Sequence, residues 1–222
     1  MTRLVTVAHG TRHTPGNEVA RTLTAQAGSR LGLASTCSYV ELCAPLFADV
    51  VVGSAEPTVV VPLLLSTGHH LRHDLPSAVA AAPGAVSLGP SLGPDPLLAE
   101  AQVARLVAAG ARPGQPAVMV AAGSNDPLAM RDLTRAAVLL EAAWGGPVEL
   151  ATLGGHGIRP SEVVRHGTAV SPYLLAEGHF AQRTRSECAS ADVVAAVIGP
   201  HERVVDLVVQ RAEGLLAERR SA

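Results

Sequence analysis

The fold is decided by the segment Val5–Arg12, which reads VTVAHGTR and returns 113 residues later as Val118–Asn125, VMVAAGSN. Self-similarity at a nearly constant period indicates two copies of one structural unit. Three further segments return in the same order at offsets of 106 to 110 residues: Val40–Leu42 as Val148–Leu150, Pro62–His70 as Pro172–Phe180, and Leu92–Pro94 as Ile198–Pro200.

The two copies differ at residues that can do chemistry. His9 has become Ala122, and His70 has become Phe180. This asymmetry predicts a single site, which the N-terminal copy builds. The C-terminal copy is expected to bind no catalytic metal.

Apolar runs of strand length alternate with helical patterns in both halves, which predicts an α/β fold of two similar parallel-sheet subdomains. The linker 111–116 predicts a division into halves 1–112 and 113–222. The expected strands are Leu4–Ala8, Ser38–Leu42, Thr58–Leu65, Ala85–Leu88, Ala117–Ala121, Val148–Thr152, Thr168–Leu175 and Asp192–Val197. The expected helices lie near Asn17–Leu31, Pro45–Val52, Asp74–Ala82 (with Asp74 as N-cap), Pro96–Ala109, Leu128–Ala143, Pro160–Arg165 and Glu202–Glu218.

Composition excludes several classes of protein. Of the 222 residues 48% are hydrophobic and 16% are charged, which is enough for a buried core and argues against disorder. All 17 basic residues are arginine, so a lysine Schiff base and a phosphate-binding loop with its Gly-Lys-Ser/Thr ending are excluded. The formal net charge of −2 argues against a nucleic-acid-binding surface.

The expected location is the cytoplasm. The chain runs from Met1 directly into a strand, which leaves no room for a signal peptide. No apolar stretch approaches the ~20 residues that span a bilayer, so no membrane contact is expected. The three cysteines form no CxxC pair and are expected to be reduced packing groups.

The candidate functional residues follow the predicted strands. Ligands of parallel α/β sheets bind beyond the carboxyl ends of the strands. His9, Glu41 and the loop Ser66–His70 all lie at such ends, so they are expected to converge. Imidazole is the commonest metal ligand near neutral pH, and three histidines stand within residues 69–73.

Simpler interpretations stay open for each of these residues. His9 could cap a turn, and the histidine-rich loop could be solvated. Glu41 could bond to backbone at a strand end, as Glu149 would in the second copy. Arg12 and Arg72 flank the histidine segments and are either surface residues or an anion-recognition rim. His156, His166 and His201 lie outside the repeated segments and are expected to be incidental.

The segments 8–12, 40–42 and 62–76, with Gly-His-His-Leu-Arg-His-Asp-Leu-Pro in the last, resemble the sirohydrochlorin chelatases. These are class II, ATP-independent cobalto- and ferrochelatases of the CbiX/SirB type, and the resemblance covers nearly the whole chain. It implies two α/β subdomains with an active-site cleft between them that holds a tetrapyrrole. Thr11 stands where many relatives have serine.

The resemblance assigns metal-binding and catalytic roles to His9, His70 and Glu41. The adjacent His69 leaves open which imidazole faces the metal. The expected substrate-binding residues are Gly10, Thr11, Arg12, Ser66, Gly68 and Arg72. In the second copy, Phe180 is expected either to pack on the tetrapyrrole or to be part of the core.

The implied function is insertion of Co²⁺ or Fe²⁺ into sirohydrochlorin for cobalamin or sirohaem. No cofactor is expected beyond the substrate metal (Co²⁺, Fe²⁺ or Ni²⁺), and the chain is expected to be a monomer or a homodimer. The alternatives are a nickel chelatase and a non-catalytic metal or tetrapyrrole carrier on the same fold. A histidine phosphatase is disfavoured, because Ala8 stands where that class has an arginine before its histidine.

Overall fold

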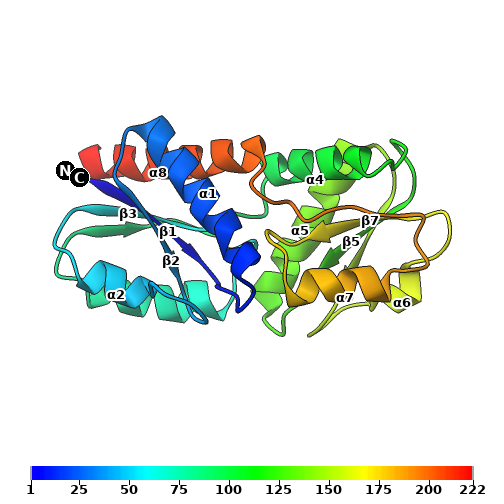
Figure 1. The fold of residues 1–222 in the computed structure, drawn as a ribbon, viewed down its shortest axis with the longest axis horizontal. Helices are drawn as coiled ribbons and strands as arrows, with labels where there is room; N and C mark the ends of the chain where they lie inside the picture. Colours follow the sequence, from blue (N-terminus) through cyan, green and yellow to red (C-terminus); the bar gives the residue numbers. More distant parts are fainter. Residues whose placement is uncertain (1, 222) are drawn as a thin grey trace. The chain divides into compact units, whose positions relative to one another are not determined.

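The computed structural model describes residues 2–221 and contains two compact units. Unit 1 comprises the residues up to Leu92 together with the chain from Val204 onward, and unit 2 comprises Gly93–Arg203. Each unit is built on one four-stranded parallel sheet. Figure 1 shows both sheets, each with helices on its two faces.

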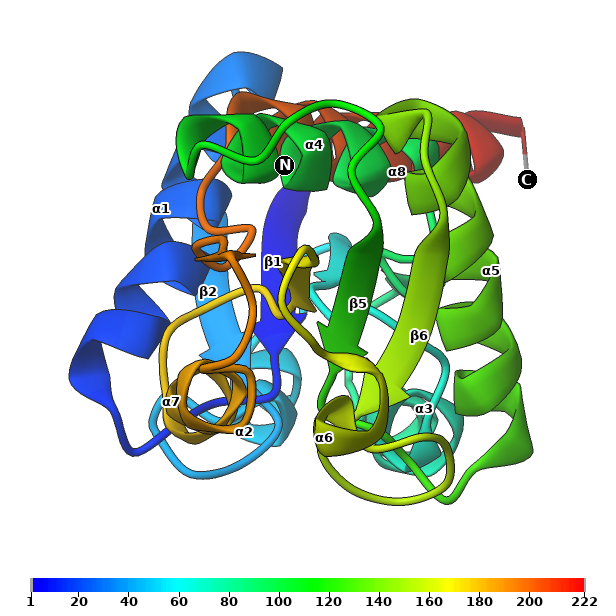
Figure 2. The same cartoon turned by 90° about the vertical axis from the view of Figure 1, so that its right-hand side faces the viewer.

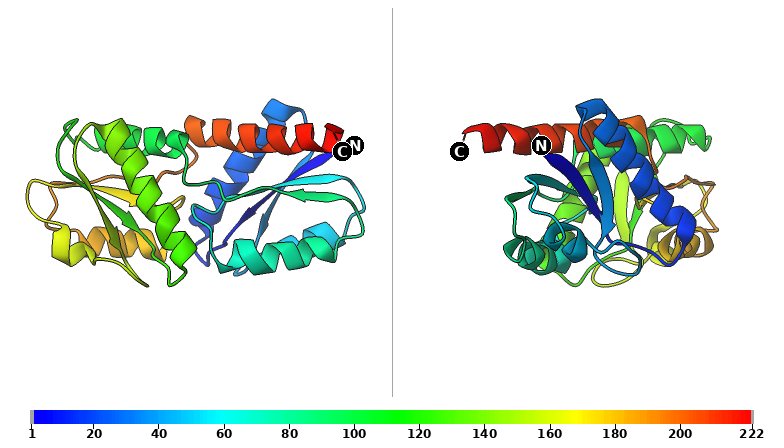
Figure 3. Two further views of the ribbon diagram at one scale, coloured as in Figure 1. Left: turned by 180° about the vertical axis from the view of Figure 1, so that it is seen from behind. Right: turned by 60° about the vertical axis from the view of Figure 1, so that its left-hand side comes forward.

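Unit 1 has the strand order β2-β1-β3-β4. The strands are β1 (Arg3–Ala8), β2 (Ser35–Tyr39), β3 (Thr58–Pro62) and β4 (Val86–Leu88). One face is covered by α1 (Thr14–Leu31) and α8 (Glu202–Ser221), and the other by α2 (Phe47–Val52) and α3 (Leu75–Ala80), as Figures 1 and 3 show. A π-helical turn, η1 (His70–Asp74), leads into α3.

Unit 1 is held together by a core of branched aliphatic side chains. Leu4, Val5 and Val7 of β1 are fully buried, because this strand lies between two others and between two helix layers. Val5, Val7 and Val60 pack with residues of α2 and α3 on one face of the sheet.

Unit 2 repeats this topology with the strand order β6-β5-β7-β8. The strands are β5 (Ala117–Ala121), β6 (Val148–Thr152), β7 (Ala169–Tyr173) and β8 (Val193–Val194). The helices are α4 (Pro96–Ala108) and α5 (Pro127–Trp144) on one face, and α6 (Pro160–Val163) and α7 (His179–Glu187) on the other (Figure 2).

The common topology confirms the prediction of two similar α/β subdomains. Leu4–Ala8 and Ala117–Ala121 occupy equivalent central positions in their sheets. In each sequence copy, however, the helix that follows the fourth strand belongs to the unit of the other copy. Helix α4 of the first copy lies in unit 2, and α8 of the second copy lies in unit 1. The side chain of Arg30 pairs with Asp206 of α8 in unit 1, and Gln102 of α4 bonds to Ser171 Oγ at 2.8 Å in unit 2. The sequence halves 1–112 and 113–222 therefore differ from the compact units by an exchange of α4 and α8.

The predicted equivalence of Glu41 and Glu149 is wrong. Strand β1 pairs Leu4 with Ser35, and β5 pairs Ala117 with Val148, so Ser35 and Val148 are equivalent. The same register places Gly154 at the position of Glu41. The hydrogen bond from Val40 N to Ala8 O (2.9 Å) recurs as Leu153 N to Ala121 O (3.0 Å), which agrees with this register.

Several predicted boundaries also change. The second strand is Ser35–Tyr39 rather than Ser38–Leu42. Its hydrogen-bonded pairing with β1 begins at Ser35, in a polar stretch where no apolar pattern indicates a strand. Asp74 is not an N-cap: its backbone is already helical and its side chain makes no cap hydrogen bond. Helix α7 was not predicted; its sequence, HFAQRTRSE, lacks a clear apolar stripe.

The cysteines are unpaired, with Cys188 fully buried and Cys37 and Cys43 partly buried. Burial raises the pKa of the Cys188 thiol to about 11, as fits a packing group. Within residues 2–221, no helix combines the length and the apolar composition that a membrane crossing requires.

Candidate metal centre

The position of Glu41 beside His9 follows from the pairing of β1 and β2. The two strands continue their hydrogen bonds past their ends, from Val40 N to Ala8 O (2.9 Å) and from Glu41 N to His9 O (3.2 Å). Parallel strands bring their carboxyl ends to one edge of the sheet, so the residues after β1 and β2 become neighbours. The Glu41 Oε1 atom lies 3.6 Å from His9 Nε2.

Gly10 allows this approach. Its φ is +96°, and a Cβ atom at this position would lie 2.0 Å from the Glu41 carbonyl oxygen. Only glycine adopts this backbone conformation readily and leaves that space empty. The expected substrate-binding residue Gly10 therefore has a structural task, which is to seat the Glu41 backbone against the turn after β1.

The turn that carries His9 is held by a buried asparagine, which the sequence analysis missed. Asn17 Oδ1 accepts a hydrogen bond from Thr11 N (3.1 Å), and Asn17 Nδ2 donates to Thr11 O (2.8 Å). The hydroxyl of Tyr39 donates to Asn17 O at 3.2 Å. Burial, with a smaller contribution from a hydrogen bond with Cys37, raises the pKa of Tyr39 far above its usual range, so the phenol stays neutral.

His70 reaches the same edge from η1, after β3. Its Nε2 lies 3.2 Å from His9 Nε2, and the ring planes cross at 82°. Its Nδ1 lies 2.6 Å from Asp74 Oδ2. A carboxylate can only accept hydrogen bonds, so Nδ1 is the donor and the Nε2 lone pair is left to face His9.

Asp74 is thus a second residue that the sequence analysis missed. The sequence signal for this role is that Asp74 follows His70 by four residues, because residues four apart lie on one face of a helix.

His9, Glu41 and His70 form the one group of three converging ligands found among residues 2–221, with ligand atoms all within 4.8 Å of one another. Two ligands ~2.1 Å from one ion would be separated by 3.2 and 3.6 Å at angles of roughly 100° and 120°. The pairs His9–His70 and His9–Glu41 therefore each fit ligation of one first-row divalent ion. Three protein ligands leave positions open for exchange, as in catalytic metal sites.

Of the two neighbouring histidines, His70 is the one whose Nε2 lies beside His9 Nε2, and its role as the metal-facing imidazole stays a prediction. The His69 ring centroid lies 6.2 Å from that of His70, and the His69 side chain is 73% exposed. The side chains of His9 and Glu41 are half exposed, so both can exchange ligands or protons with solvent.

The backbone beside Glu41 is strained. Leu42 has a φ of +69°, and Cys43 N donates to Glu41 O at 2.9 Å, which closes a γ-turn of the rare positive-φ kind. The Leu42 side chain is 47% exposed, so no core packing compensates the strain. The equivalent residue in unit 2 is Gly155, with a φ of +65°. The strain and the exposed apolar side chain make Leu42 a candidate for a functional role.

The other expected substrate-binding residues surround this edge of unit 1. Thr11, Ser66 and Gly68 are partly buried in the turns after β1 and β3. Arg12 and Arg72 are exposed on the same turns. The expected roles of these five residues stay predictions.

Unit 2 carries none of the three ligands at the equivalent positions, where it has Ala122, Gly154 and Phe180. Phe180 is 41% exposed, so it is not part of the core. Its ring lies 5.5 Å from that of His179.

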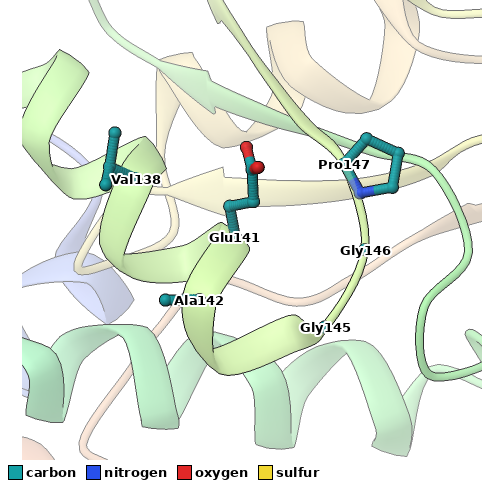
Figure 4. A pocket seen from close by; sticks show the side chains of 6 residues that line it. All are labelled: Val138, Glu141, Ala142, Gly145, Gly146 and Pro147. Carbon is teal, nitrogen blue, oxygen red and sulfur yellow. The ribbon is translucent and has the colours of Figure 1, made fainter.

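A surface pocket of unit 2 carries none of this chemistry (Figure 4). It is lined by the end of α5 and the start of the connection to β6, which is the amino edge of the sheet. Glu141 is its one ionisable side chain. Ligands of parallel sheets bind at the opposite edge, where His9, Glu41 and His70 lie.

Replacing Asp74 with alanine is expected to weaken Co²⁺ binding by about 10- to 100-fold, because the His70 ring loses the partner that orients it. Titration calorimetry with Co²⁺ measures the effect. Asp49→Ala, which removes an exposed carboxylate from α2, is the matched control. Equal affinities for the two variants would show that Asp74 does not position His70.

Comparisons with known proteins point to one group. The CbiX family matches residues 3–109. The solved structure of SirB from Bacillus subtilis with Fe³⁺ is 25% identical, with a TM-score of 0.83 over 99% of this chain and 97% of that one.

Two further structures share the fold. SirB from Bacillus subtilis subspecies spizizenii in complex with cobalt is 23% identical, with a TM-score of 0.76 over 99% and 97% of the two chains. DR2241 from Deinococcus radiodurans is 20% identical, with a TM-score of 0.75 over 96% of this chain and 55% of that one. No curated protein sequence matches.

Proposed function

We propose that this chain is a chelatase of the CbiX/SirB type and that it inserts a divalent metal ion into sirohydrochlorin. The match of the CbiX family over residues 3–109 and the likeness to the SirB structures support this proposal. The proposed substrate ions are Co²⁺ and Fe²⁺, for cobalamin or sirohaem. We propose the cytoplasm as its location.

The observation that carries the proposal is the convergence of His9, His70 and Glu41 at the carboxyl edge of the sheet. His9 Nε2 lies 3.2 Å from His70 Nε2 and 3.6 Å from Glu41 Oε1, and one first-row ion can bridge each of these separations. The relatives with bound iron and cobalt agree with such a site.

Insertion exchanges one M²⁺ for two protons, which leave the pyrrole nitrogens. Imidazoles and a carboxylate can hold the ion before transfer and accept protons afterwards. His9 and Glu41 are half exposed, so protons can pass to water. Asp74 keeps the His70 Nε2 atom available throughout, because it engages the opposite ring nitrogen. The absence of a phosphate-binding loop agrees with a reaction without ATP.

The proposed rim for the carboxylates of sirohydrochlorin consists of Arg12 and Arg72. Both arginines are exposed and belong to the segments that carry His9 and His70, and arginine binds carboxylates through paired hydrogen bonds. Gly10, Thr11, Ser66 and Gly68 are proposed to contribute the surrounding backbone. That the macrocycle enters a cleft stays a prediction.

The ligand set favours no single metal. Two imidazoles and one carboxylate suit Co²⁺, Fe²⁺ and Ni²⁺ alike, since site affinity follows ligand type only coarsely. The decisive experiment is therefore metal insertion into purified sirohydrochlorin, followed by absorbance, with the three ions compared in the absence of ATP. Rates no higher than those without protein for all three ions would overturn the proposal.

The variant Glu41→Gln distinguishes a chelatase from a non-catalytic carrier. A carrier would still bind Co²⁺ and sirohydrochlorin after Glu41→Gln. Neither the wild-type carrier nor this variant would accelerate metal insertion. A chelatase is expected to lose insertion activity in this variant, because the amide can no longer accept protons or neutralise the ion.

Leu42→Gly is expected to stabilise unit 1 by about 1 kcal/mol, because glycine adopts the positive φ without strain. The same change is expected to raise the KM for sirohydrochlorin, since the exposed leucine is proposed to pack against the macrocycle. Thermal unfolding and steady-state insertion kinetics measure the two effects. Val107→Ala, at another exposed aliphatic side chain, is the control. A variant that is less stable, or that has an unchanged KM, would contradict this role.

A further inference from the structure

Two histidines on the turn of the metal centre take no part in it. The ring centroids of His69 and His73 lie 4.7 Å apart, with their planes inclined by 35°. Both side chains are exposed. The backbone is helical from His69 through η1, so the two residues lie four apart on one helical face. Paired histidines at this spacing hold divalent zinc in helical metal sites.

Asp74 connects this pair with the metal centre. Its Oδ1 lies 3.9 Å from His69 Nε2, and its Oδ2 lies 2.6 Å from His70 Nδ1. The opposite nitrogen of His70 faces His9 at 3.2 Å. One carboxylate therefore faces both His69 of the exposed pair and the inner ligand His70, and its negative charge favours a cation on this turn.

Unit 2 has lost the pair together with the metal ligands. The register of β3 and β7 makes His179 equivalent to His69, and Arg183 equivalent to His73. Arg183 has a structural task, since it bonds to Leu153 O (2.9 Å) and Glu187 Oε1 (2.6 Å). The paired histidines thus occur only in the copy that has the three ligands.

We propose that His69 and His73, assisted by Asp74, form an outer site that captures a divalent first-row cation from solution. The ion then passes to His9, Glu41 and His70. This passage exchanges ligands and leaves the oxidation state of the ion unchanged. Capture by the pair rests on the helical spacing and the ring contact of His69 and His73, whereas the direction of passage rests on the proposed function.

The first test is equilibrium binding of Co²⁺ alone. The variant His9→Ala/His70→Ala removes the inner ligands and is expected to retain one weaker Co²⁺ site. Adding His73→Gln is expected to abolish that site, and adding His156→Gln, at an exposed histidine of unit 2, is expected to leave it. The proposal is overturned if the double variant binds no Co²⁺, or if His73→Gln does not change its binding. Circular dichroism verifies the fold of each variant.

The second test is insertion into sirohydrochlorin at limiting Co²⁺. His73→Gln is expected to lower the rate by about fivefold or more there, and by a smaller factor at saturating Co²⁺. If His73→Gln lowers the insertion rate by the same factor at both Co²⁺ concentrations, the proposal that the ion passes from the histidine pair is overturned. If the wild-type protein inserts no metal but the binding pattern of the variants holds, the outer site stands and the proposed function fails.

Discussion

Alanine at His9 or at His70 is expected to reduce metal insertion by about 1,000-fold or more, equivalent to ~4 kcal/mol of transition-state stabilisation. Each substitution removes one of two imidazoles whose Nε2 atoms lie 3.2 Å apart, so the remaining ligands cannot enclose the ion. The measurement is the initial rate of Co²⁺ insertion, followed by absorbance.

Both variants are expected to fold. The His9 side chain is half exposed, and the His70 side chain is 28% exposed, so neither substitution leaves a cavity in the core. Thermal unfolding verifies this, with His156→Ala as the control for an exposed histidine outside the centre. A near-normal rate in either variant would refute the assignment of the metal centre.

Gly10→Ala is expected to destabilise the protein by about 3 kcal/mol and to abolish insertion. The new Cβ would lie 2.0 Å from the Glu41 carbonyl oxygen in a backbone with a φ of +96°. To relieve the clash, the Glu41 backbone must leave the turn after β1, which moves the carboxylate away from His9. Denaturant unfolding and the insertion rate per folded molecule measure the two effects.

The duplicated fold provides a matched control in Gly123→Ala. Its Cβ would lie 1.9 Å from the Gly154 carbonyl oxygen, with a φ of +89°, so a similar loss of stability is expected. The folded fraction of this variant is expected to keep its insertion activity, because no ligand stands at residue 154. Gly32→Ala, with a φ of +62° and no atom within 4 Å of the new Cβ, is expected to cost only about 1 kcal/mol. Equal activity of the Gly10 and Gly123 variants would contradict the role of Gly10.

The sequence by itself determined the duplication and the fold class, and it predicted that His9, Glu41 and the loop Ser66–His70 converge. Repetition at a fixed offset is visible without coordinates, and so is the loss of His9 and His70 from the second copy. Parallel strands carry residues at their carboxyl ends to a common edge, so the convergence of these residues with Glu41 also followed from the order of the elements.

Only the tertiary structure decided the partners of these residues. The hydrogen-bond register between β1 and β2 joins segments about 30 residues apart, and it made Gly154, not Glu149, the counterpart of Glu41. The start of η1 places His70, rather than His69, beside His9, and it makes Asp74 the partner of the His70 imidazole instead of the expected helix cap. The positive φ of Leu42 and the exchange of α4 and α8 likewise depend on contacts between distant segments, which local pattern and composition do not encode.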